Sequence, residues 1–418
     1  MQPAVCNKLN FPNTMLLSVI MCMVLFTVNG QQPYRFDNVL YKAVYWNEAT
    51  KLMKENQNYL LIDVRTPGEY ADTSSHTHLN MGHLKGAVNI NIDSFDQHIA
   101  ELKKYSDKKI FLYCSHSQRS RRVSKLLADN GFQNVYNING GMSVANESGA
   151  RAFPLKSSIL VNGNLYKNIA STDAVEMIQN KDVLIIDVRS EEGFSSKDSV
   201  FSRNLGRIKN AVNIPSNGFV QKFKALDVPK TKTILVYDLG GQESTDIATE
   251  IARLGYANVF NLFEGLEALL NDNYLSPVSV KKLLVNPAPF EVVSTREAIN
   301  LLSKPNDFFV IDARSAEEFN NKAQRTFLNV GRLKNANNIT AVEGLAPVVD
   351  KLSKHANILV YGSYSGNNDV DLVKALIEKG YRNVHFLYQG IGRFAWSCFN
   401  IENCKDGIQL LTDHEGLY

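Results

Sequence analysis

Residues 60–70 read LLIDVRTPGEY, and close copies of this stretch occur twice more in the chain. LIIDVRSEEGF begins at Leu184, and FVIDARSAEEF begins at Phe309. Each copy starts with three consecutive apolar residues, a pattern typical of a strand buried on both faces of a parallel sheet. Each then continues with Asp-x-Arg at the predicted end of that strand. The aspartates are Asp63, Asp187 and Asp312, spaced by 124 and 125 residues.

Two further strings repeat in the same register. One reads GHLKGAVNI in the first copy, and the other closes with NVYNINGG, NVFNLFEG or NVHFLYQG. A period of this length indicates a domain and not a solenoid repeat. The chain is therefore predicted to hold three tandem domains of one fold. The first string begins at Gly82, Gly206 and Gly331, and the second ends at Gly141, Gly265 and Gly390.

Helical and strand patterns alternate within each copy. In the first copy, residues 48–56 and 120–130 have the spacing of amphipathic helices, and short apolar runs between and after them predict strands. This alternation predicts an α/β fold in which each domain has a mostly parallel central sheet flanked by helices. In such sheets, ligands bind beyond the carboxyl ends of the strands. The strands of the first copy are expected near 60–63, 87–90, 110–113 and 134–138.

Segments that mix Pro, Ser, Asn and charge are the best candidates for domain boundaries. Two such segments are 145–158 and 271–290. The predicted domains are 31–150, 158–272 and 288–400, followed by a C-terminal tail over 401–418.

The N-terminal segment differs in composition from the rest of the chain. Met15–Val28 is a run of 14 nearly all apolar residues, which is short for a membrane span of roughly 20 residues. Small or medium-sized residues, Val28, Asn29 and Gly30, then precede a polar stretch. This pattern predicts a secretory signal peptide over 1–30, cut near Gly30. An uncleaved N-terminal anchor is the alternative. The signal peptide predicts a periplasmic or extracellular location, with no membrane span after cleavage.

The composition is that of a soluble globular protein, with 418 residues, 44% hydrophobic, 21% charged and a net charge of +3. The near-neutral charge and the lack of a dense basic block argue against nucleic acid or anionic membrane as a partner. No set of residues has the spacing of metal ligands, so neither a metal nor another cofactor is predicted.

The cysteines raise a question about compartment and reactivity. Cys6 and Cys22 leave with the predicted signal peptide. Cys398 and Cys404 are six residues apart and form either a small-loop disulfide or two unrelated free thiols. Cys114 has no evident partner, and an unpaired thiol in an exported protein requires a reason.

The first copy carries a specific set of motifs. They are Asp63-Val64-Arg65, the string from Gly82 to Ala87, a loop from Cys114 to Arg119, and Gly140-Gly141. Together these motifs resemble the rhodanese family, and the resemblance extends over three tandem domains, nearly the whole mature chain. It implies a sulfurtransferase whose cysteine, here Cys114, takes a sulfane sulfur from a small anion such as thiosulfate. The persulfide then passes the sulfur to a thiol or another thiophilic acceptor.

The residues themselves fit this chemistry. A nucleophilic cysteine reacts as its thiolate, and backbone N–H groups at a helix N-terminus favour that anion. The backbone N–H groups from Ser115 to Arg119 are predicted to form a cradle for the anion, and the Arg119 side chain adds a forked donor suited to an oxyanion. The residues predicted to bind substrate are Ser115, His116, Ser117, Gln118, Arg119 and Ser120. Without the repeated frame, Cys114 would be read as a small buried residue at a strand end.

Several other charged residues in the first copy receive structural interpretations. Asp63 and Arg65 are predicted to form an ion pair near the strand end. His83 is predicted to be packed or hydrogen-bonded, and Arg121 and Arg122 are predicted to lie on a solvated helix face.

The other two copies lack the nucleophile. Asp238 and Gly362 stand at the position of Cys114, so domains two and three are predicted to be inactive. Family members commonly have Gly where Ser117 stands, and a glycine there permits positive φ. Ser117 is therefore expected to cost about 1 kcal/mol of backbone strain, or to reshape the cradle.

Two alternatives to the sulfurtransferase remain open. A non-catalytic binding or scaffold protein would explain two copies without the cysteine. A cysteine phosphatase or arsenate reductase would need a loop one residue longer, with Arg where Ser120 stands.

Overall fold

The structure is a computed structural model, and it describes residues 41–414 except 181, 201–202, 289, 305–307 and 365–367. The predicted signal peptide, with Cys6 and Cys22, lies outside the described residues, so its prediction is not tested. No helix within the described ranges combines the length and hydropathy needed to cross a bilayer.

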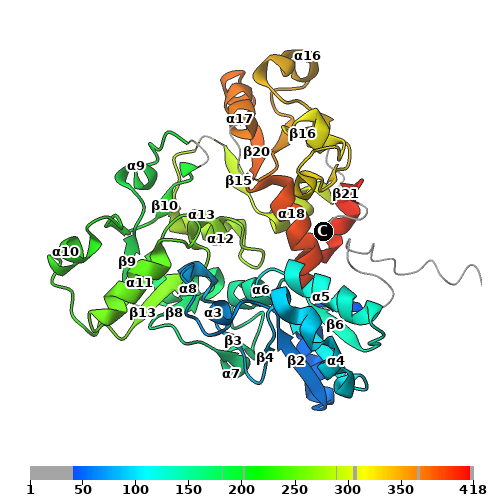
Figure 1. Cartoon of the computed structure of the whole chain (residues 1–418). Coiled ribbons are helices and arrows are strands. Elements are labelled where there is room, and N and C mark those ends of the chain that lie inside the picture. Colours follow the sequence, from blue (N-terminus) through cyan, green and yellow to red (C-terminus); the bar gives the residue numbers. More distant parts are fainter. Residues whose placement is uncertain are drawn as a thin grey trace, which may run out of the picture. The chain divides into compact units, whose positions relative to one another are not determined.

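Three five-stranded sheets, one in each repeat, form the framework of the described residues (Figure 1). All neighbouring strands in these sheets pair in parallel, and all three sheets have the same order. The first order is β1 (Lys42–Val44), β6 (Val135–Ile138), β5 (Lys109–Tyr113), β2 (Tyr59–Asp63) and β4 (Val88–Asn89). The second is β8 (Lys167–Ile169), β13 (Val259–Leu262), β12 (Thr233–Tyr237), β9 (Val183–Asp187) and β11 (Val212–Asn213). The third is β15 (Glu291–Val293), β20 (Asn383–Leu387), β19 (Asn357–Tyr361), β16 (Phe308–Asp312) and β18 (Asn337–Asn338).

Helices connect these strands and confirm the predicted α/β architecture of three tandem domains. The first repeat contains α2 (Trp46–Glu55), α3 (Pro67–Tyr70), α4 (Ile99–Leu102), α5 (Gln118–Asp129), α6 (Gly141–Glu147) and α7 (Lys156–Ile159). The second contains α8 (Ser171–Asn180), α9 (Glu191–Phe194), α10 (Phe219–Lys224), α11 (Ser244–Arg253), α12 (Gly265–Leu270) and α13 (Pro277–Leu283). The third contains α14 (Thr295–Leu302), α15 (Ala316–Phe319), α16 (Ala346–Val349), α17 (Asn368–Glu378) and α18 (Gly390–Asn400). Short 3-10 turns are η1 (Thr77–Leu79), η2 (Ile92–His98), η3 (Lys103–Tyr105), η5 (Thr326–Leu328), η6 (Val342–Gly344) and η7 (Glu402–Leu410).

The central strands are buried on both faces, which explains their continuous apolar sequences. In the first domain, Leu61 and Phe111 join one hydrophobic cluster with Trp46 of α2. Ile62 and Leu112 face the opposite way and join a second cluster, whose α5 members include Val123 and Leu127. Successive side chains of a strand point to opposite faces, so each strand contributes to both clusters.

A short strand after each sheet returns to the same repeat. β7 (Leu160–Val161) pairs antiparallel with β3 (His83–Leu84), and β14 (Leu284–Val285) pairs with β10 (Arg207–Ile208). β21 (Leu411–Thr412) pairs with β17 (Arg332–Leu333). The segments proposed as boundaries, 145–158 and 271–290, are therefore not open linkers. They contain the end of α6, the start of α7, and α13.

Candidate active site

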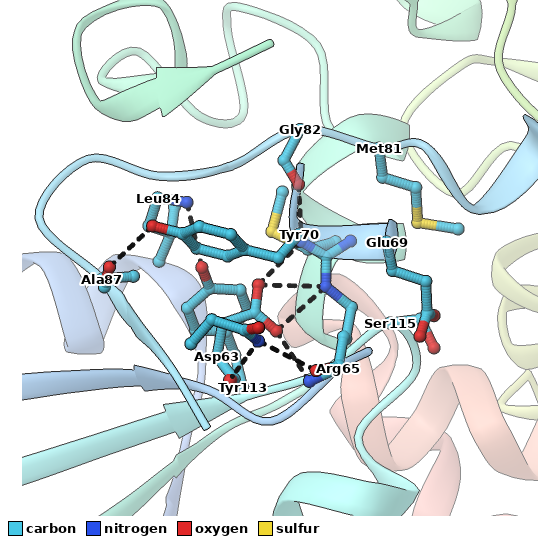
Figure 2. A network of polar contacts seen from close by, with 12 residues as sticks. Asp63, Arg65, Glu69, Tyr70, Met81, Gly82, Leu84, Ala87, Tyr113 and Ser115 are labelled. Carbon is cyan, nitrogen blue, oxygen red and sulfur yellow. Dashed lines mark hydrogen bonds and ion pairs between the residues drawn. The ribbon is translucent and has the colours of Figure 1, made fainter. Parts of the chain in front are cut away.

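A buried ion pair supports the strand that lies beside the cysteine loop (Figure 2). The Arg65 guanidinium donates to both Asp63 carboxylate oxygens, at 2.7–3.0 Å, and to the Gly82 carbonyl oxygen, at 2.7 Å. The Tyr113 hydroxyl accepts a hydrogen bond from the Leu84 amide at 3.0 Å. Asp63 and Arg65 are both fully buried, which agrees with their predicted structural role.

The same network recurs in the other repeats. Arg189 pairs with Asp187 and donates to the Gly206 carbonyl, and Arg314 pairs with Asp312 and donates to the Gly331 carbonyl. It therefore belongs to the fold common to all three domains, with or without a cysteine.

Cys114 follows β5 directly, at the carboxyl edge of the first sheet. Its side chain is buried, and Ser120 Oγ lies 3.6 Å from Sγ, although the hydroxyl has a closer acceptor in Asn137 Oδ1 at 2.6 Å. The Cys114 carbonyl accepts from the Met142 amide at 2.9 Å. Gly141 has φ +52°, and a Cβ on it would lie 2.1 Å from the Cys114 carbonyl oxygen. Only glycine lets the start of α6 approach the cysteine this closely.

The loop after Cys114 runs into the N-terminus of α5, which begins at Gln118. Within the described residues, the amide N–H groups of 116–120 donate no hydrogen bond. Such N–H groups carry the positive end of the helix dipole and suit an anion. The loop therefore leaves backbone N–H donors available in the residues that follow Cys114.

Ser117 has a φ of +80°, the left-handed backbone conformation that a glycine at this position would permit. Its side chain is fully buried, and its Oγ accepts from the Gly140 amide at 2.7 Å. The Gly140 amide also donates to Asn400 Oδ1, at 3.0 Å, in α18 of the third repeat. The hydroxyl thus ties the strained residue to the turn that opens α6.

Arg119 is held by a carboxylate that the sequence interpretation had not assigned to the site. Its two terminal nitrogens donate to the Glu69 carboxylate at 2.7 and 2.6 Å, and one also donates to Ser115 Oγ at 2.9 Å. Burial alone would raise the pKa of Glu69, but hydrogen bonds from Arg119 and Thr66 outweigh it and lower that pKa to about 2. Glu69 therefore balances the positive charge of the Arg119 guanidinium. Through its bonds to Glu69 and Ser115, Arg119 also holds the loop in place.

The repeats contain a signal for Glu69. Glu318 stands 249 residues later, at the corresponding position of the third copy, and it accepts from Ser363 Oγ at 2.8 Å. The second copy has Gly193 there. Two of the three copies therefore have a glutamate at this position, and in both the following loop supplies a hydroxyl or guanidinium donor. This recurrence could have indicated that Glu69 binds Arg119.

Residues from the other two repeats surround the mouth of the loop. Trp396 Nε1 donates to the His116 carbonyl at 3.4 Å, and Glu264 Oε1 lies 4.0 Å from His116 Nε2. Glu264 also accepts from Ser143 Oγ at 2.6 Å. Loss of hydration among these side chains lowers the pKa of His116 to about 4, although 44% of its side chain stays exposed. Gln118 is exposed, so the predicted binding residues divide between a buried cradle and an open rim.

Each of the three repeats contains one match to a family model. The model of the rhodanese-like domain matches residues 46–147, 171–272 and 294–395. The chain belongs to the rhodanese family.

Rhodanese relatives align with parts of this chain. The tRNA uridine(34) hydroxylase of Buchnera aphidicola is 34% identical over 94 residues, which are 22% of this chain and 27% of that protein. Protein YqhL of Bacillus subtilis is 38% identical over 81 residues, which are 19% of this chain and 56% of that protein. The chain thus spans about a quarter and about half of the lengths of these two curated relatives. The solved thiosulfate sulfurtransferase of Pseudomonas aeruginosa is 12% identical and covers 83% of this chain and 66% of its own, with a TM-score of 0.22.

The second rhodanese domain fills its own cradle. The Asp238 carboxylate accepts from the amides of Gly241, Glu243 (2.6 Å) and Ser244 (3.3 Å). Gly241 has φ +80°, the same value as Ser117 at the equivalent position. Burial raises the pKa of Asp238 despite these donors. The loop shares the positive φ of the first domain, although α11 begins two residues later than the equivalent of Gln118, and its amides are engaged by a carboxylate.

The third rhodanese domain has no side chain at the cysteine position. A Cβ on Gly362 would lie 2.5 Å from Asp369 Oδ2, so neighbouring groups already occupy that space. Residues 365–367 of this loop lie outside the described part of the chain.

One of the two predictions of a solvated arginine in α5 is wrong. Arg121 is 1% exposed, and its NH2 donates to Asn139 Oδ1 at 2.6 Å. It lies on the face of α5 that packs toward the end of β6, whereas Arg122 is exposed as predicted. Nothing in the sequence indicated this burial because the immediate neighbours of Arg121 are the polar residues Ser120 and Arg122.

The two C-terminal cysteines are separate thiols. Cys398 lies in α18 and Cys404 in η7, and both are fully buried and unbonded to each other. Burial raises the pKa of each thiol. Of the two alternatives drawn from the sequence, the structure therefore has the free thiols.

Proposed function

We propose that this rhodanese is a sulfurtransferase that carries sulfane sulfur on Cys114. Membership of the family supports sulfur transfer in this broad sense. The observation that carries the finer proposal is the loop of 116–120, whose amide N–H groups are unengaged within the described residues beside Cys114. Anions are stabilised by such donors, and a reactive cysteine needs its thiolate favoured over the thiol.

The proposed reaction has two displacement steps. The Cys114 thiolate attacks the outer sulfur of a donor such as thiosulfate, the S–S bond of the donor breaks, and sulfite leaves with the bonding electrons. An acceptor thiolate or cyanide then attacks the outer sulfur of the persulfide, and Cys114 leaves as a thiolate. The loop amides stabilise the anionic sulfur in both steps.

We also propose that the protein is exported. This rests on the apolar run Met15–Val28 and the polar residues that follow it. N-terminal sequencing of protein secreted or released from cells, with cleavage near Gly30, would support it. Recovery of the uncleaved chain in membranes would favour the anchor.

The sulfurtransferase proposal predicts a mass gain on one residue. Incubation with thiosulfate should add about 32 Da at Cys114, as a persulfide, and cyanide should remove it as thiocyanate. Cys114→Ser should abolish both adduct and thiocyanate formation, whereas Cys398→Ser serves as a matched control that keeps both. Unchanged activity in Cys114→Ser would contradict the proposal.

A non-catalytic scaffold is the second candidate, and burial of Cys114 favours it. Two of the three domains also lack the cysteine. This candidate predicts that thiosulfate produces no adduct on Cys114, even after hours, while the free thiol still reacts with a small alkylating agent after unfolding.

A further inference from the structure

The first two carbonyl groups of the cysteine loop are held from within the first repeat. The Cys114 carbonyl accepts from the Met142 amide at 2.9 Å, and the Ser115 carbonyl accepts from the Ser143 amide at 2.9 Å. Both donors lie in the first turn of α6. The corresponding amides of α12 and α18 bind the corresponding loop carbonyls in the other two repeats, so these two bonds belong to the shared fold.

The third carbonyl of the loop is held from another repeat. The Trp396 indole Nε1, in α18, donates to the His116 carbonyl oxygen at 3.4 Å, which is long for a hydrogen bond. The other two copies have Glu147 and Asn271 at the position of Trp396. This donor is therefore specific to the third repeat and is not part of the shared fold.

The Trp396 contact orients an N–H group of the loop as well as a carbonyl. A trans peptide points its C=O and N–H in opposite directions, so the bond to the His116 carbonyl directs the Ser117 N–H away from α18. The Ser117 amide donates no hydrogen bond within the described residues. Hydrogen bonding at the carbonyl also polarises the peptide and makes its N–H a stronger donor. The contact therefore leaves the Ser117 N–H oriented and available to an anion.

A second residue of α18 holds the turn to which the loop is bonded. Asn400 ends the helix and is buried, and its Oδ1 accepts from the Gly140 amide at 3.0 Å. The same amide donates to Ser117 Oγ at 2.7 Å. Asn400 Nδ2 donates to the Trp396 carbonyl at 2.8 Å. Asn400 therefore connects Trp396 to the turn that anchors Ser117.

Apolar and ionic contacts keep α18 next to α6. Phe394 and Met142 are fully buried members of one hydrophobic cluster, which spans the first and third repeats. Arg393 donates to Glu147 at 2.8 Å, and only 13% and 11% of these two side chains are exposed. The helix that carries Trp396 and Asn400 is thus held in place by contacts other than those two residues make with the loop.

We propose that α18 of the third repeat positions the cysteine loop for sulfur transfer, with Trp396 and Asn400 as positioning residues. The proposal rests on the proposed function and gives a repeat without a nucleophile a role at the site of the first. Trp396 holds the His116–Ser117 peptide with its N–H ready for anionic sulfur, and Asn400 holds the turn bonded to Ser117. A donor that is already in place stabilises a developing anion better than one that must reorient during the reaction.

Thiocyanate formation by the full-length chain, from thiosulfate and cyanide, tests the Trp396 contact. Trp396→Phe keeps a ring and removes the donor, and Trp396→Ala removes both, so both variants should lower kcat/KM by about 10-fold. Asn47→Ala is the matched control, because it removes another hydrogen bond between the first and third repeats, from Asn47 Nδ2 to Glu402 Oε2 at 3.1 Å. Its kcat/KM should stay at the parent value. Parent activity in Trp396→Phe, or an equal loss in Asn47→Ala, would overturn the proposal.

Asn400→Ala tests the second contact and replaces Trp396→Phe if urea denaturation shows that variant to be unfolded. It removes the acceptor shared by the Gly140 amide and the donor to the Trp396 carbonyl, so kcat/KM should fall by about 5-fold. A folded Asn400→Ala protein with parent activity would overturn the role of Asn400.

Binding of thiosulfate without chemistry separates this proposal from the proposed function. In calorimetric titration of full-length Cys114→Ser protein, adding Trp396→Phe should weaken thiosulfate binding by about 10-fold, and adding Asn47→Ala should not. Equal affinities with and without Trp396→Phe, or no binding in either, would overturn the positioning role even if the parent forms a persulfide. If the affinities differ as expected but the parent forms no persulfide, the proposed function fails, whereas the positioning of an anion-binding loop by α18 is supported.

Discussion

At the scale of single residues, Ser117 has two opposing effects on stability. Its φ of +80° is unfavourable for any side chain with a Cβ, by roughly 1–2 kcal/mol. Its Oγ accepts the Gly140 amide at 2.7 Å, and such a hydrogen bond contributes about 1 kcal/mol. The hydroxyl therefore offsets much of the strain that its own residue introduces, which explains how a serine can occupy a position suited to glycine.

Substitutions at this position should separate the two effects. Ser117→Gly loses the hydrogen bond but relieves the strain, so its free energy of unfolding should stay within about 0.5 kcal/mol of the parent. Ser117→Ala keeps the strain and loses the bond, so it should be less stable than Ser117→Gly by about 1 kcal/mol. Urea denaturation of both variants measures this. An alanine variant as stable as the glycine variant would show that the backbone there is unstrained.

At the scale of elements, the Glu69–Arg119 pair joins the starts of two helices. Glu69 closes a capping box at the N-terminus of α3, since its amide donates to Thr66 Oγ1 and its carboxylate accepts from the Thr66 amide. The same carboxylate holds Arg119, in the first turn of α5. A capping motif in one part of the first domain thus positions the cysteine loop in another.

This connection predicts a loss of stability in acid. The pKa of Glu69 falls from 4.5 to about 2 on folding, which corresponds to about 3 kcal/mol at neutral pH. Because the pKa is lowered on folding, this contribution is present above about pH 4.5 and is lost as the pH falls toward about 2. Urea denaturation followed by Trp46 fluorescence in a Trp396→Phe background should show it. Glu69→Gln should reduce the loss of unfolding free energy at low pH, and Asp96→Asn, an exposed control, should not.

The local parts of the site followed from the sequence, and the long-range parts did not. The Asp63–Arg65 pair was predicted because its two residues are separated by one position on the same strand end. Strain at Ser117 was one of two expected outcomes because rhodaneses commonly have glycine there, and the φ of +80° agrees with it. Arg119 was expected to face a substrate oxyanion, but Glu69, 50 residues earlier, already binds it. Local spacing carries no information about which distant carboxylate reaches a loop.

At the scale of the whole chain, the repeats are equivalent in fold but not in their contacts. Gly140, Glu264 and Gln389 occupy one position of the three copies. The first of them immediately precedes α6, and the second accepts from Ser143 Oγ and lies 4.0 Å from His116 Nε2. Alignment of the copies predicts what they share, which is the sheet and the ion pair. The residues of other repeats that contact the cysteine loop and the start of α6 lie where the copies differ, so repetition could not reveal them.

The carboxylates between repeats predict a second pH effect, of opposite sign. Burial, with repulsion from Glu264, raises the pKa of Glu147 above 4.5, although Arg393 opposes this. The folded chain then holds a proton that the unfolded chain releases, so stability should fall as the pH rises from about 5 to 8, by on the order of 1–3 kcal/mol. Glu147→Gln should reduce this slope in urea denaturation, whereas Glu343→Gln should keep the parent slope. Equal slopes for parent and Glu147→Gln would show that Glu147 is ionised throughout.

The returning strands β7, β14 and β21 affect how any single repeat can be isolated. The family match ends at residues 147, 272 and 395, but the strands that pair with β3, β10 and β17 lie 12–17 residues beyond these points. A fragment cut at those limits would leave backbone N–H and C=O groups of a strand open to solvent. Such an edge is a template for pairing with another chain, and so for aggregation. Recombinant fragments that extend to residues 161, 285 and 412 would include the strand that pairs with this edge.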